Sequence, residues 1–332
     1  MNLGIDAYNL IADRRGMGRV VRCALHGLQE RGASPVLIGR TRADRATLQA
    51  QFGLPAITAG DVRNARFAAV WFPWNAVRFE PHAVCAVTVH DPFAFTFPHR
   101  NAVARWREQR PIARAVRRAD RVFAVSHWTA RELRRLFGID GSRMTVVPNE
   151  PDAYWKPVAA DGRTPYLLFL GGAEERKNAT MLLRAFECAS ANGHAAQLVI
   201  AGALAKDAEQ LAASLANVRR EHPDDERLRE LYSGALALLV PSLAEGFGLP
   251  VLEAMACGAP VLAADAAALP ETAGGAAELV ALTPDAWERA IVRIAADAQL
   301  RDDLRARGFK RVENATRGAA VTALLHLARG AR

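Results

Sequence analysis

Cysteine is scarce in this sequence, and no long apolar run occurs in it. The four cysteines form no C-x-x-C pair, which excludes the common thiolate metal sites and a disulfide-stapled scaffold; they are Cys23, Cys85, Cys188 and Cys257. Each lies in an apolar segment, so we expect buried, reduced thiols. No stretch of about 18 apolar residues is present, so no membrane-spanning helix is expected. The chain begins directly with a strand pattern rather than with a signal peptide, and we expect a cytoplasmic protein.

A complete dinucleotide-binding fingerprint is also lacking. A glycine turn follows the first expected strand, with Gly16 and Gly18 ahead of a helix from Val20. The fingerprint G-x-G-x-x-G needs a third glycine where Val21 stands. The turn is therefore weak evidence for a nicotinamide oxidoreductase, and no ribose-binding acid is evident at the usual distance.

Acidic residues are too few in the first half to balance the basic ones. The first 160 residues contain 24 Lys and Arg against 13 Asp and Glu, while the remainder contains 19 against 22. The excess is densest in a probable helix that ends near residue 121 and carries Arg105, Arg107, Arg110, Arg114, Arg117, Arg118 and Arg121. A solvated face, an anionic membrane surface and an acceptor diphosphate all fit this pattern. Nucleic acid fits least, because no binding motif accompanies the arginines.

What the sequence does contain is enough apolar material for two cores, with 51% apolar residues in a chain of 332. The most informative stretch runs from 235 to 270. An apolar strand at 235–240 is followed by a loop with two glycines, Pro250 as the first residue of a short helix, Gly258 as its stop, and a second strand from Pro260. This order predicts a βαβ unit whose loop lies at the carboxyl edge of a parallel sheet, where ligands bind in doubly wound folds.

Two carboxylates frame that loop. Glu245 lies on the loop and Glu253 one turn into the helix, with seven residues between them. The free N–H groups of the helix start favour an anion such as a phosphate. Carboxylates beside such a site would repel the phosphate unless they bind neutral hydroxyls next to it. Sugar and ribose hydroxyls are the natural partners.

The pattern from Glu245 through Glu253, Gly258, Pro260 and Pro270-Glu271 resembles the E-x7-E signature of the retaining family 4 glycosyltransferases. The resemblance implies an α/β protein of the GT-B fold, with two Rossmann-like parallel-sheet domains facing each other across a cleft. It implies an acceptor-binding domain at 1–155, a donor-binding domain at 156–314, and a helix at 315–332 that packs back on the first domain. Residues 154–165 would form the linker.

The resemblance also assigns roles in the first domain. His90-Asp91 matches the family's H-D pair beside the reacting sugar carbon, so His90 is expected to be catalytic and Asp91 to orient it or the loop. The glycine turn with Gly16, Gly18 and Arg19 matches a turn facing the donor diphosphate. Ser126 resembles a serine at the cleft, expected to support the site from behind.

In the second domain, Arg176 and Lys177 match the pair that holds the donor diphosphate, and Asn178 is expected to cap the following helix. Both cations precede a helix N-terminus, where positive charge is unfavourable, so we expect a bound anion nearby. Glu245 and the loop residues Gly246, Phe247, Gly248 and Leu249 would bind the sugar, and Glu253 the ribose. With these cations present and no D-x-D pair, no metal or other cofactor is expected.

The donor and acceptor are the least determined. E-E-R-K-N and H-D-P-F-A-F look most like bacterial mannosyltransferases of surface polysaccharide synthesis that use GDP-mannose. UDP- or dTDP-sugar donors share the same frame. The expected acceptor is a glycan or a polyprenyl-diphosphate-linked sugar, with peripheral membrane contact through the Arg105–Arg121 region. An inactive sugar-nucleotide sensor and a nicotinamide oxidoreductase are the alternatives.

Overall fold

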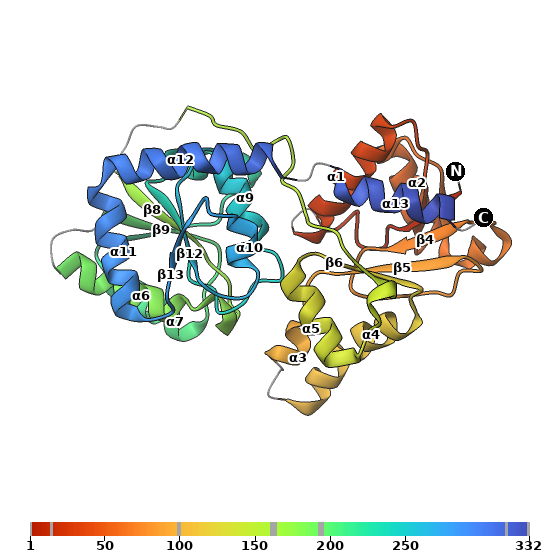
Figure 1. Cartoon of the computed structure of the whole chain (residues 1–332), viewed down its shortest axis with the longest axis horizontal. Helices are drawn as coiled ribbons and strands as arrows, with labels where there is room; N and C mark the ends of the chain where they lie inside the picture. The colour runs from red at the N-terminus through yellow and green to blue at the C-terminus, as the bar shows by residue number, and fades with distance from the viewer. Residues whose placement is uncertain are drawn as a thin grey trace. The chain divides into compact units, whose positions relative to one another are not determined.

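The computed structural model describes residues 2–13, 16–97, 101–159, 165–191, 196–315 and 318–330. The chain divides into two compact units, and in Figure 1 each unit contains a sheet with helices packed on it. Unit 1 consists of Met1–Glu150 with Thr316–Arg332, and unit 2 of Pro151–Ala315. The first border therefore lies five residues before the one placed at 155. Part of the expected linker, residues 160–164, lies outside the described residues.

Unit 1 is built on a seven-stranded parallel sheet with the order β3-β2-β1-β4-β5-β6-β7. Apolar runs at 2–9, 35–39, 68–72, 83–89 and 121–125 predict five of its strands, while β3 and β7, three residues each, are not predicted. The strands are β1 (Leu3–Asp6), β2 (Val36–Gly39), β3 (Ala56–Thr58), β4 (Ala69–Phe72), β5 (Val84–Val89), β6 (Arg121–Ala124) and β7 (Met144–Val146).

Helices cover both faces of this sheet. Side chains of a strand alternate between faces, so Trp71 joins one core and its neighbour Val70 the other. The first core includes α1 and α13; the second includes α4 and α5. The helical segments of unit 1 are α1 (Met17–Glu30), α2 (Arg42–Phe52), η1 (Ala59–Asn64), α3 (Phe93–Thr96), α4 (Ala102–Arg118), α5 (His127–Phe137), η2 (Gly141–Arg143) and α13 (Ala319–Gly330).

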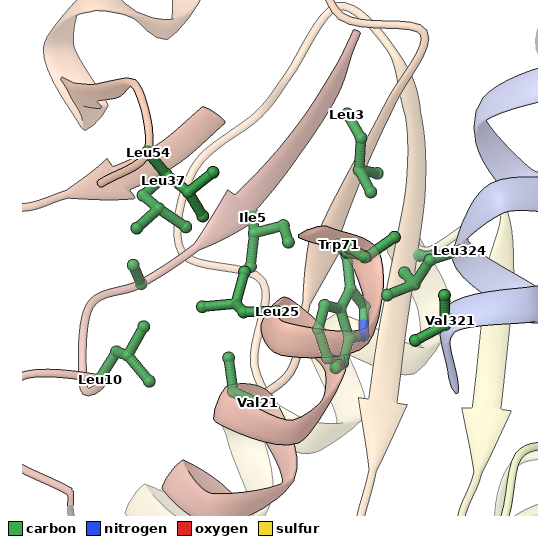
Figure 2. Packing of buried hydrophobic residues seen from close by; sticks show 14 of the residues in the cluster. Leu3, Ile5, Leu10, Val21, Leu25, Leu37, Leu54, Trp71, Val321 and Leu324 are labelled. Carbon is green, nitrogen blue, oxygen red and sulfur yellow. The ribbon is translucent and has the colours of Figure 1, made fainter. Parts of the chain in front are cut away.

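The last helix belongs to unit 1, as the resemblance implied. Val321 and Leu324 of α13 lie beside Trp71 of β4 in the core that Figure 2 shows, and each of the three is at most 2% exposed. This packing joins the end of the chain to strands formed by its first 72 residues. The burial of one apolar face of α13 explains why the helix forms there.

Unit 2 contains a six-stranded parallel sheet with the order β10-β9-β8-β11-β12-β13. The strands are β8 (Tyr166–Leu170), β9 (Gln197–Ala201), β10 (Val218–Glu221), β11 (Ala237–Val240), β12 (Val261–Ala264) and β13 (Glu278–Val280). Its helical segments are η3 (Glu175–Lys177), α6 (Ala179–Ala191), α7 (Lys206–Ser214), α8 (Asp225–Gly234), α9 (Leu249–Ala256), α10 (Leu269–Ala273), α11 (Pro284–Ala296) and α12 (Ala298–Glu313).

The βαβ unit predicted around the two glutamates is present as β11–α9–β12. Gly248 precedes α9 with φ 91°, and Gly258 follows it with φ 84°, both in the left-handed region that glycine adopts without strain. At Gly248 a Cβ would also approach Leu269 Cδ2 to 2.9 Å. The loop conformation therefore depends on glycine for two separate reasons.

Two expectations from composition have different outcomes. Cys85 and Cys257 are buried, and burial raises the pKa of each thiol to about 12. Cys188 is exposed and Cys23 half-buried, so the expectation of buried thiols is wrong for Cys188, which lies on the solvent side of α6. Among the described residues, no helix is both long and apolar enough to cross a membrane.

The packing of α13 predicts a specific loss of stability. Leu324→Ala should lower the free energy of unfolding of unit 1 by about 2–5 kcal/mol, because it leaves a cavity at a fully buried position. His326→Ala, at an exposed position of the same helix, should change it by less than about 0.5 kcal/mol. Hydrogen exchange of the β1 amides along a urea series measures both. Equal effects of the two substitutions would contradict the packing.

Candidate active site

Three charged side chains meet at the carboxyl edge of the unit 2 sheet. Glu245 lies on the loop after β11, and Arg176 and Lys177 belong to η3, after β8, the strand that pairs with β11. Lys177 Nζ donates to Glu245 Oε1 at 2.8 Å, and Arg176 Nη1 donates to Glu245 Oε2 at 3.1 Å. The structure therefore brings Glu245 to two adjacent cations that lie 69 and 68 positions earlier in the sequence.

Burial and charge act in opposite directions on Glu245. The residue is 9% exposed, and burial alone would raise its pKa. The charges of Lys177 and Arg176, with hydrogen bonds from Lys177 and Ser242, outweigh that effect, so the pKa of Glu245 lies below its usual value. Glu245 is thus an anion. The sequence led us to expect a bound anion near Arg176 and Lys177, but the negative charge beside them comes from Glu245 of the protein itself. The protein itself compensates the two cations ahead of α6.

Ser242 and Asn178 fix the surroundings of this cluster. Ser242 Oγ donates to Glu245 Oε1 at 2.8 Å. Asn178 was predicted to cap α6 with its side chain, but its amide instead donates to the carbonyl oxygen of Pro241 at 3.2 Å. Its φ of 56° is left-handed, which turns the chain from η3 into α6. Asn178 therefore connects the two loops that carry the charges, and the prediction of a side-chain cap is wrong.

The loop from Gly246 to Leu249 is fixed by a hydrogen bond from α10. The hydroxyl of Thr272 donates to the carbonyl oxygen of Phe247, whose side chain is 6% exposed. Leu249 begins α9, directly after Gly248. A recess of about 10 Å³, the space of one water molecule, is lined by Gly248 of this loop, by Lys177, Ser242 and Glu245, and by apolar residues of the neighbouring strands and of α9. The loop thus presents backbone groups beside the charged cluster on a rigid support.

Glu253, on α9, is 2% exposed, and the hydroxyl of Tyr232 lies 3.3 Å from its Oε2. It lies in the same βαβ unit as Glu245, as expected. The carboxylate accepts a hydrogen bond from within unit 2. Its assignment to a ribose stays a prediction.

His90 follows β5 at the carboxyl edge of the unit 1 sheet and is 9% exposed. Burial lowers its pKa to about 4, although the carbonyl of Pro73 and the charge of Asp13 act in the other direction. The ring is therefore neutral near pH 7. Because Nε2 lies 2.9 Å from the carbonyl oxygen of Pro73, which can only accept, Nε2 carries the proton. Nδ1 is then an acceptor, suited to a hydroxyl donor.

Asp91 and Ser126 organise loops in unit 1. Asp91 Oδ1 accepts the N–H of Phe93 at 3.1 Å and so shapes the turn into α3. Ser126 is fully buried and caps α5 by accepting the N–H of Thr129 at 3.0 Å. Each contact stabilises backbone beside the sheet edge, and the supporting roles of both residues in the site stay predictions.

The glycine turn of unit 1 carries a carboxylate of the protein. Asp13 Oδ2 accepts the N–H of Gly18 at 3.1 Å, in the first turn of α1. A Cβ on Gly18 would lie 1.9 Å from the carbonyl oxygen of Asp13, so this glycine is required by close packing. Gly16 is exposed and Arg19 half-buried. A phosphate at this helix start would meet the charge of Asp13, which weakens both the dinucleotide interpretation and a diphosphate contact by Gly18.

Sequence reasoning missed two supporting residues. Asn75 accepts the backbone N–H of His90 through Oδ1 at 2.7 Å and has a φ of 58°. Ser242 binds Glu245 directly. Asn75 lies three residues beyond the end of β4. Because functional polar residues of parallel sheets follow the carboxyl ends of strands, this position could have been predicted from the sequence. Ser242 stands three residues before Glu245, but nothing in the sequence alone distinguishes it from an ordinary loop serine.

Two family models match the chain. The model described as Glycosyl transferases group 1 matches residues 152–311, and the model described as Glycosyltransferase Family 4 matches residues 62–152. The two matches meet close to the border between the units. Together they extend over most of the chain, including all the candidate residues except those of the glycine turn.

Curated relatives match over shorter segments. O-antigen chain mannosyltransferase B of Escherichia coli is 30% identical in an alignment 201 positions long, which covers 54% of this chain and 52% of that protein. D-inositol 3-phosphate glycosyltransferase of Nocardiopsis dassonvillei is 30% identical in an alignment 168 positions long, which covers 43% of this chain and 39% of that protein. The chain thus spans about half or less of the length of these relatives.

Solved structures match nearly the whole chain. A glycosyltransferase from Rickettsia africae has a TM-score of 0.75 at 14% identity, covering 99% of this chain and 98% of that one. Anabaena HepE in complex with UDP has a TM-score of 0.73 at 16% identity, with 99% and 98% covered. WaaG, a glycosyltransferase involved in lipopolysaccharide biosynthesis, has a TM-score of 0.71 at 13% identity, with 99% and 100% covered. At these identities the likeness shows a shared fold.

The charged cluster predicts an acid-sensitive loss of stability. Glu245→Gln should lower the free energy of unfolding of unit 2 at pH 7 by about 3 kcal/mol, because it leaves two partly buried cations without their carboxylate. Glu174→Gln removes a second, 59% exposed partner of Arg176 and should cost less than about 1 kcal/mol. Urea unfolding, followed by hydrogen exchange of the unit 2 strands, measures both.

The pH dependence has a definite sign. Because the folded-state pKa of Glu245 is lowered, its contribution is complete above the ordinary carboxyl pKa of 4.5 and disappears as the pH falls below that value. As the pH falls below about 5, the free energy of unfolding of the wild type should therefore decrease more steeply than that of Glu245→Gln. The difference between the two slopes should correspond to the uptake of about one proton at most. Parallel profiles would contradict a charged Glu245.

Proposed function

Because this chain belongs to the family 4 glycosyltransferases and has the GT-B fold, we propose that it transfers a hexose, with retention of configuration, from a nucleotide-diphosphate sugar to a glycan or lipid-linked acceptor. The observation that carries the proposal is the meeting of Arg176, Lys177 and Glu245 beside the Gly246–Leu249 loop. Cations that face a carboxylate at a strand end can receive a diphosphate and a sugar together.

Arg176 and Lys177 would bind the diphosphate of the donor. Lys177 has three N–H donors, of which Glu245 accepts one. The side chain can therefore retain Glu245 and still donate to a phosphate oxygen. Positive charge at this place stabilises the negative charge that develops on the departing diphosphate. The proposal needs no metal ion for this task, in line with the absence of a D-x-D pair from the sequence.

Glu245 and the loop that follows it would hold the hexose, and Glu253 the ribose. Both carboxylates belong to unit 2 and lie next to the proposed nucleotide site, so the two-carboxylate scheme of the hydrolases does not apply. In the proposed reaction the acceptor oxygen attacks the anomeric carbon from the face that the diphosphate leaves. The bond to the diphosphate breaks, and a phosphate oxygen takes the proton of the acceptor.

His90 would take part as a neutral acceptor of a hydrogen bond. Its Nδ1 can accept from a hydroxyl of the sugar or of the acceptor, while Nε2 remains bound to Pro73. With a pKa near 4, the ring would not act as a general acid near pH 7. This fits a reaction in which the leaving phosphate, rather than a side chain, receives the proton.

The best candidate for the donor is GDP-mannose, in surface polysaccharide synthesis. The support is the likeness of half of this chain to O-antigen chain mannosyltransferase B of Escherichia coli. A UDP- or dTDP-sugar is the alternative, since HepE, solved with UDP, has the same fold. The name of the Nocardiopsis relative specifies a phosphate-bearing acceptor, so soluble acceptors also belong in an assay.

A helix face of unit 1 supports peripheral contact with an anionic membrane. Val103 and Trp106 of α4 are 66% and 56% exposed, and Arg110 stacks over the Trp106 ring at 4.9 Å. Helical spacing places Val103, Trp106 and Arg110 on one face of α4, opposite the buried side chains of the helix. Three further arginines share the exposed face, namely Arg107, Arg114 and Arg117, and the buried residues are Ile112, Ala115 and Val116. An exposed tryptophan flanked by arginines is typical of a helix that lies in a membrane surface.

Nucleotide binding tests the donor site. GDP at a hundred times its Kd should stabilise the wild type by about 2.7 kcal/mol, and UDP, dTDP and NAD should stabilise it less. Arg176→Gln/Lys177→Gln should lose at least about tenfold in GDP affinity, because it removes both cations. Thermal shifts with and without nucleotide on the same variant cancel any change in basal stability.

Arg184→Gln/Lys206→Gln is the matched control, since it removes two exposed charges of the same unit. It should bind GDP as the wild type does. Release of GDP from GDP-mannose in the presence of acceptor distinguishes an enzyme from a sensor that only binds. A shift with NAD alone, or equal losses in both variants, would refute the donor site.

Vesicle binding tests the α4 face. Arg110→Gln/Arg114→Gln/Arg117→Gln should bind phosphatidylglycerol vesicles at least about tenfold more weakly, at roughly 1 kcal/mol per arginine. Arg42→Gln/Arg45→Gln/Arg63→Gln removes the same charge from exposed positions elsewhere in unit 1 and should change little. Co-sedimentation at 0.1 M salt measures both. Unchanged sedimentation of the α4 variant would refute the membrane contact.

A further inference from the structure

A second group of charged side chains lies at the carboxyl edge of the unit 1 sheet and has no role in the site described above. Three adjacent strands, β2, β1 and β4, end there in parallel. Arg40 follows β2, Tyr8 follows β1 after its last residue Asp6, and Arg78 lies six residues beyond β4. Ligands of parallel α/β sheets bind at this edge.

Two guanidinium groups lie close to one aromatic ring. The Cζ of Arg40 is 5.3 Å and that of Arg78 5.1 Å from the centroid of the Tyr8 ring. Arg40 Nη2 also donates to the carbonyl oxygen of Tyr8 at 3.2 Å. A guanidinium that stacks on a ring keeps its N–H groups available in its own plane, so it can still bind an anion with two parallel hydrogen bonds.

The carboxylates nearby compensate only one of these two cations. Asp6 is fully buried and lies 3.5 Å from Arg78, and burial raises its pKa to about 6 despite the charges of Arg78 and Arg40. Asp6 is therefore still mostly ionised near pH 7, and it pairs with Arg78. Asp44 accepts the backbone N–H groups of Arg40 and Thr41 and so caps α2. Within the described part of the chain, Arg40 makes no ion pair. The group therefore has a positive side that is exposed at Arg40 and about one quarter exposed at Arg78.

We propose that Arg40 and Arg78, positioned by Tyr8 and Asp6, form a subsite for a phosphate or diphosphate group of the acceptor. A guanidinium group binds phosphate oxygens with two parallel hydrogen bonds, and two such groups lie close to the same ring here. The assignment of this phosphate to the acceptor rests on the proposed function, because the donor diphosphate is already assigned to Arg176 and Lys177 in unit 2. The binding of a phosphate by Arg40 and Arg78 does not depend on it. The subsite binds and orients, and no bond forms or breaks there.

The test uses the full chain with GDP in excess, so that the donor site is filled, and inorganic phosphate as the soluble probe. Isothermal titration calorimetry should detect a phosphate site that Arg40→Gln/Arg78→Gln weakens by about tenfold or more. Arg45→Gln/Arg63→Gln, with the same charge removed from exposed positions of unit 1, should keep the affinity within about twofold.

Single variants keep the test valid if the double variant folds poorly. The side chain of Arg40 contacts Tyr8 from an exposed position, so Arg40→Gln should remain folded and still bind phosphate more weakly. Arg78→Lys keeps a charge beside Asp6 without the planar fork, and its affinity should fall between those of the wild type and Arg78→Gln. Equal weakening in Arg45→Gln/Arg63→Gln, or unchanged affinity in Arg40→Gln, would overturn the proposal.

Vesicles distinguish a lipid phosphate from a soluble one. If the acceptor phosphate is lipid-borne, Arg40→Gln/Arg78→Gln should weaken binding to phosphatidylcholine vesicles that contain phosphatidic acid more than binding to phosphatidylglycerol vesicles. Equal binding of both vesicle types with weakened phosphate binding supports a soluble source. If GDP does not bind at all, the donor assignment fails, while the phosphate titration without nucleotide still reports on Arg40 and Arg78. Phosphate binding that is absent, or independent of both arginines, overturns the subsite.

Discussion

The contact of Glu245 with Lys177 and Arg176 is the interaction on which the organisation of unit 2 depends. Two cations lie just ahead of α6, where the helix dipole disfavours them, and the chain satisfies them with a carboxylate from the loop after β11. The same contact holds that loop against η3, assisted by Asn178 and Ser242. Structural stability and the proposed diphosphate site therefore share one set of charges.

Unit 1 solves a different electrostatic problem at its own sheet edge. His90 and Asp6 are both buried there, and burial pushes each toward its neutral form, lowering the pKa of the histidine and raising that of the aspartate. The arginines Arg40 and Arg78 retain their charge. This edge consequently combines a neutral hydrogen-bond acceptor with exposed positive charge, whereas the edge of unit 2 is built on compensated ion pairs.

Sequence patterns predicted most of the strands because buried parallel strands are short apolar runs. They missed β3, β7 and β13, which are three residues long and carry little signal. The βαβ unit around Gly248 was predicted well, since glycine and proline restrict the backbone locally. The side-chain cap expected from Asn178 was wrong because the residue is left-handed, with φ 56°, whereas a capping residue is normally extended. Its amide nitrogen donates to Pro241, 63 positions away, a contact that no local rule includes.

The sequence by itself determined the two cores, the loop between Glu245 and Glu253 and the family to which the chain belongs, because these depend on residue type, spacing and backbone preference. Only the tertiary structure decided what each charged group touches. Glu245 reaches Lys177, the carboxylate of Asp13 accepts an N–H of the first turn of α1, and Arg40 and Arg78 both lie near the Tyr8 ring. Charge and pKa are set by distance and burial, and both arise only when strands far apart in the sequence end at the same edge of a sheet.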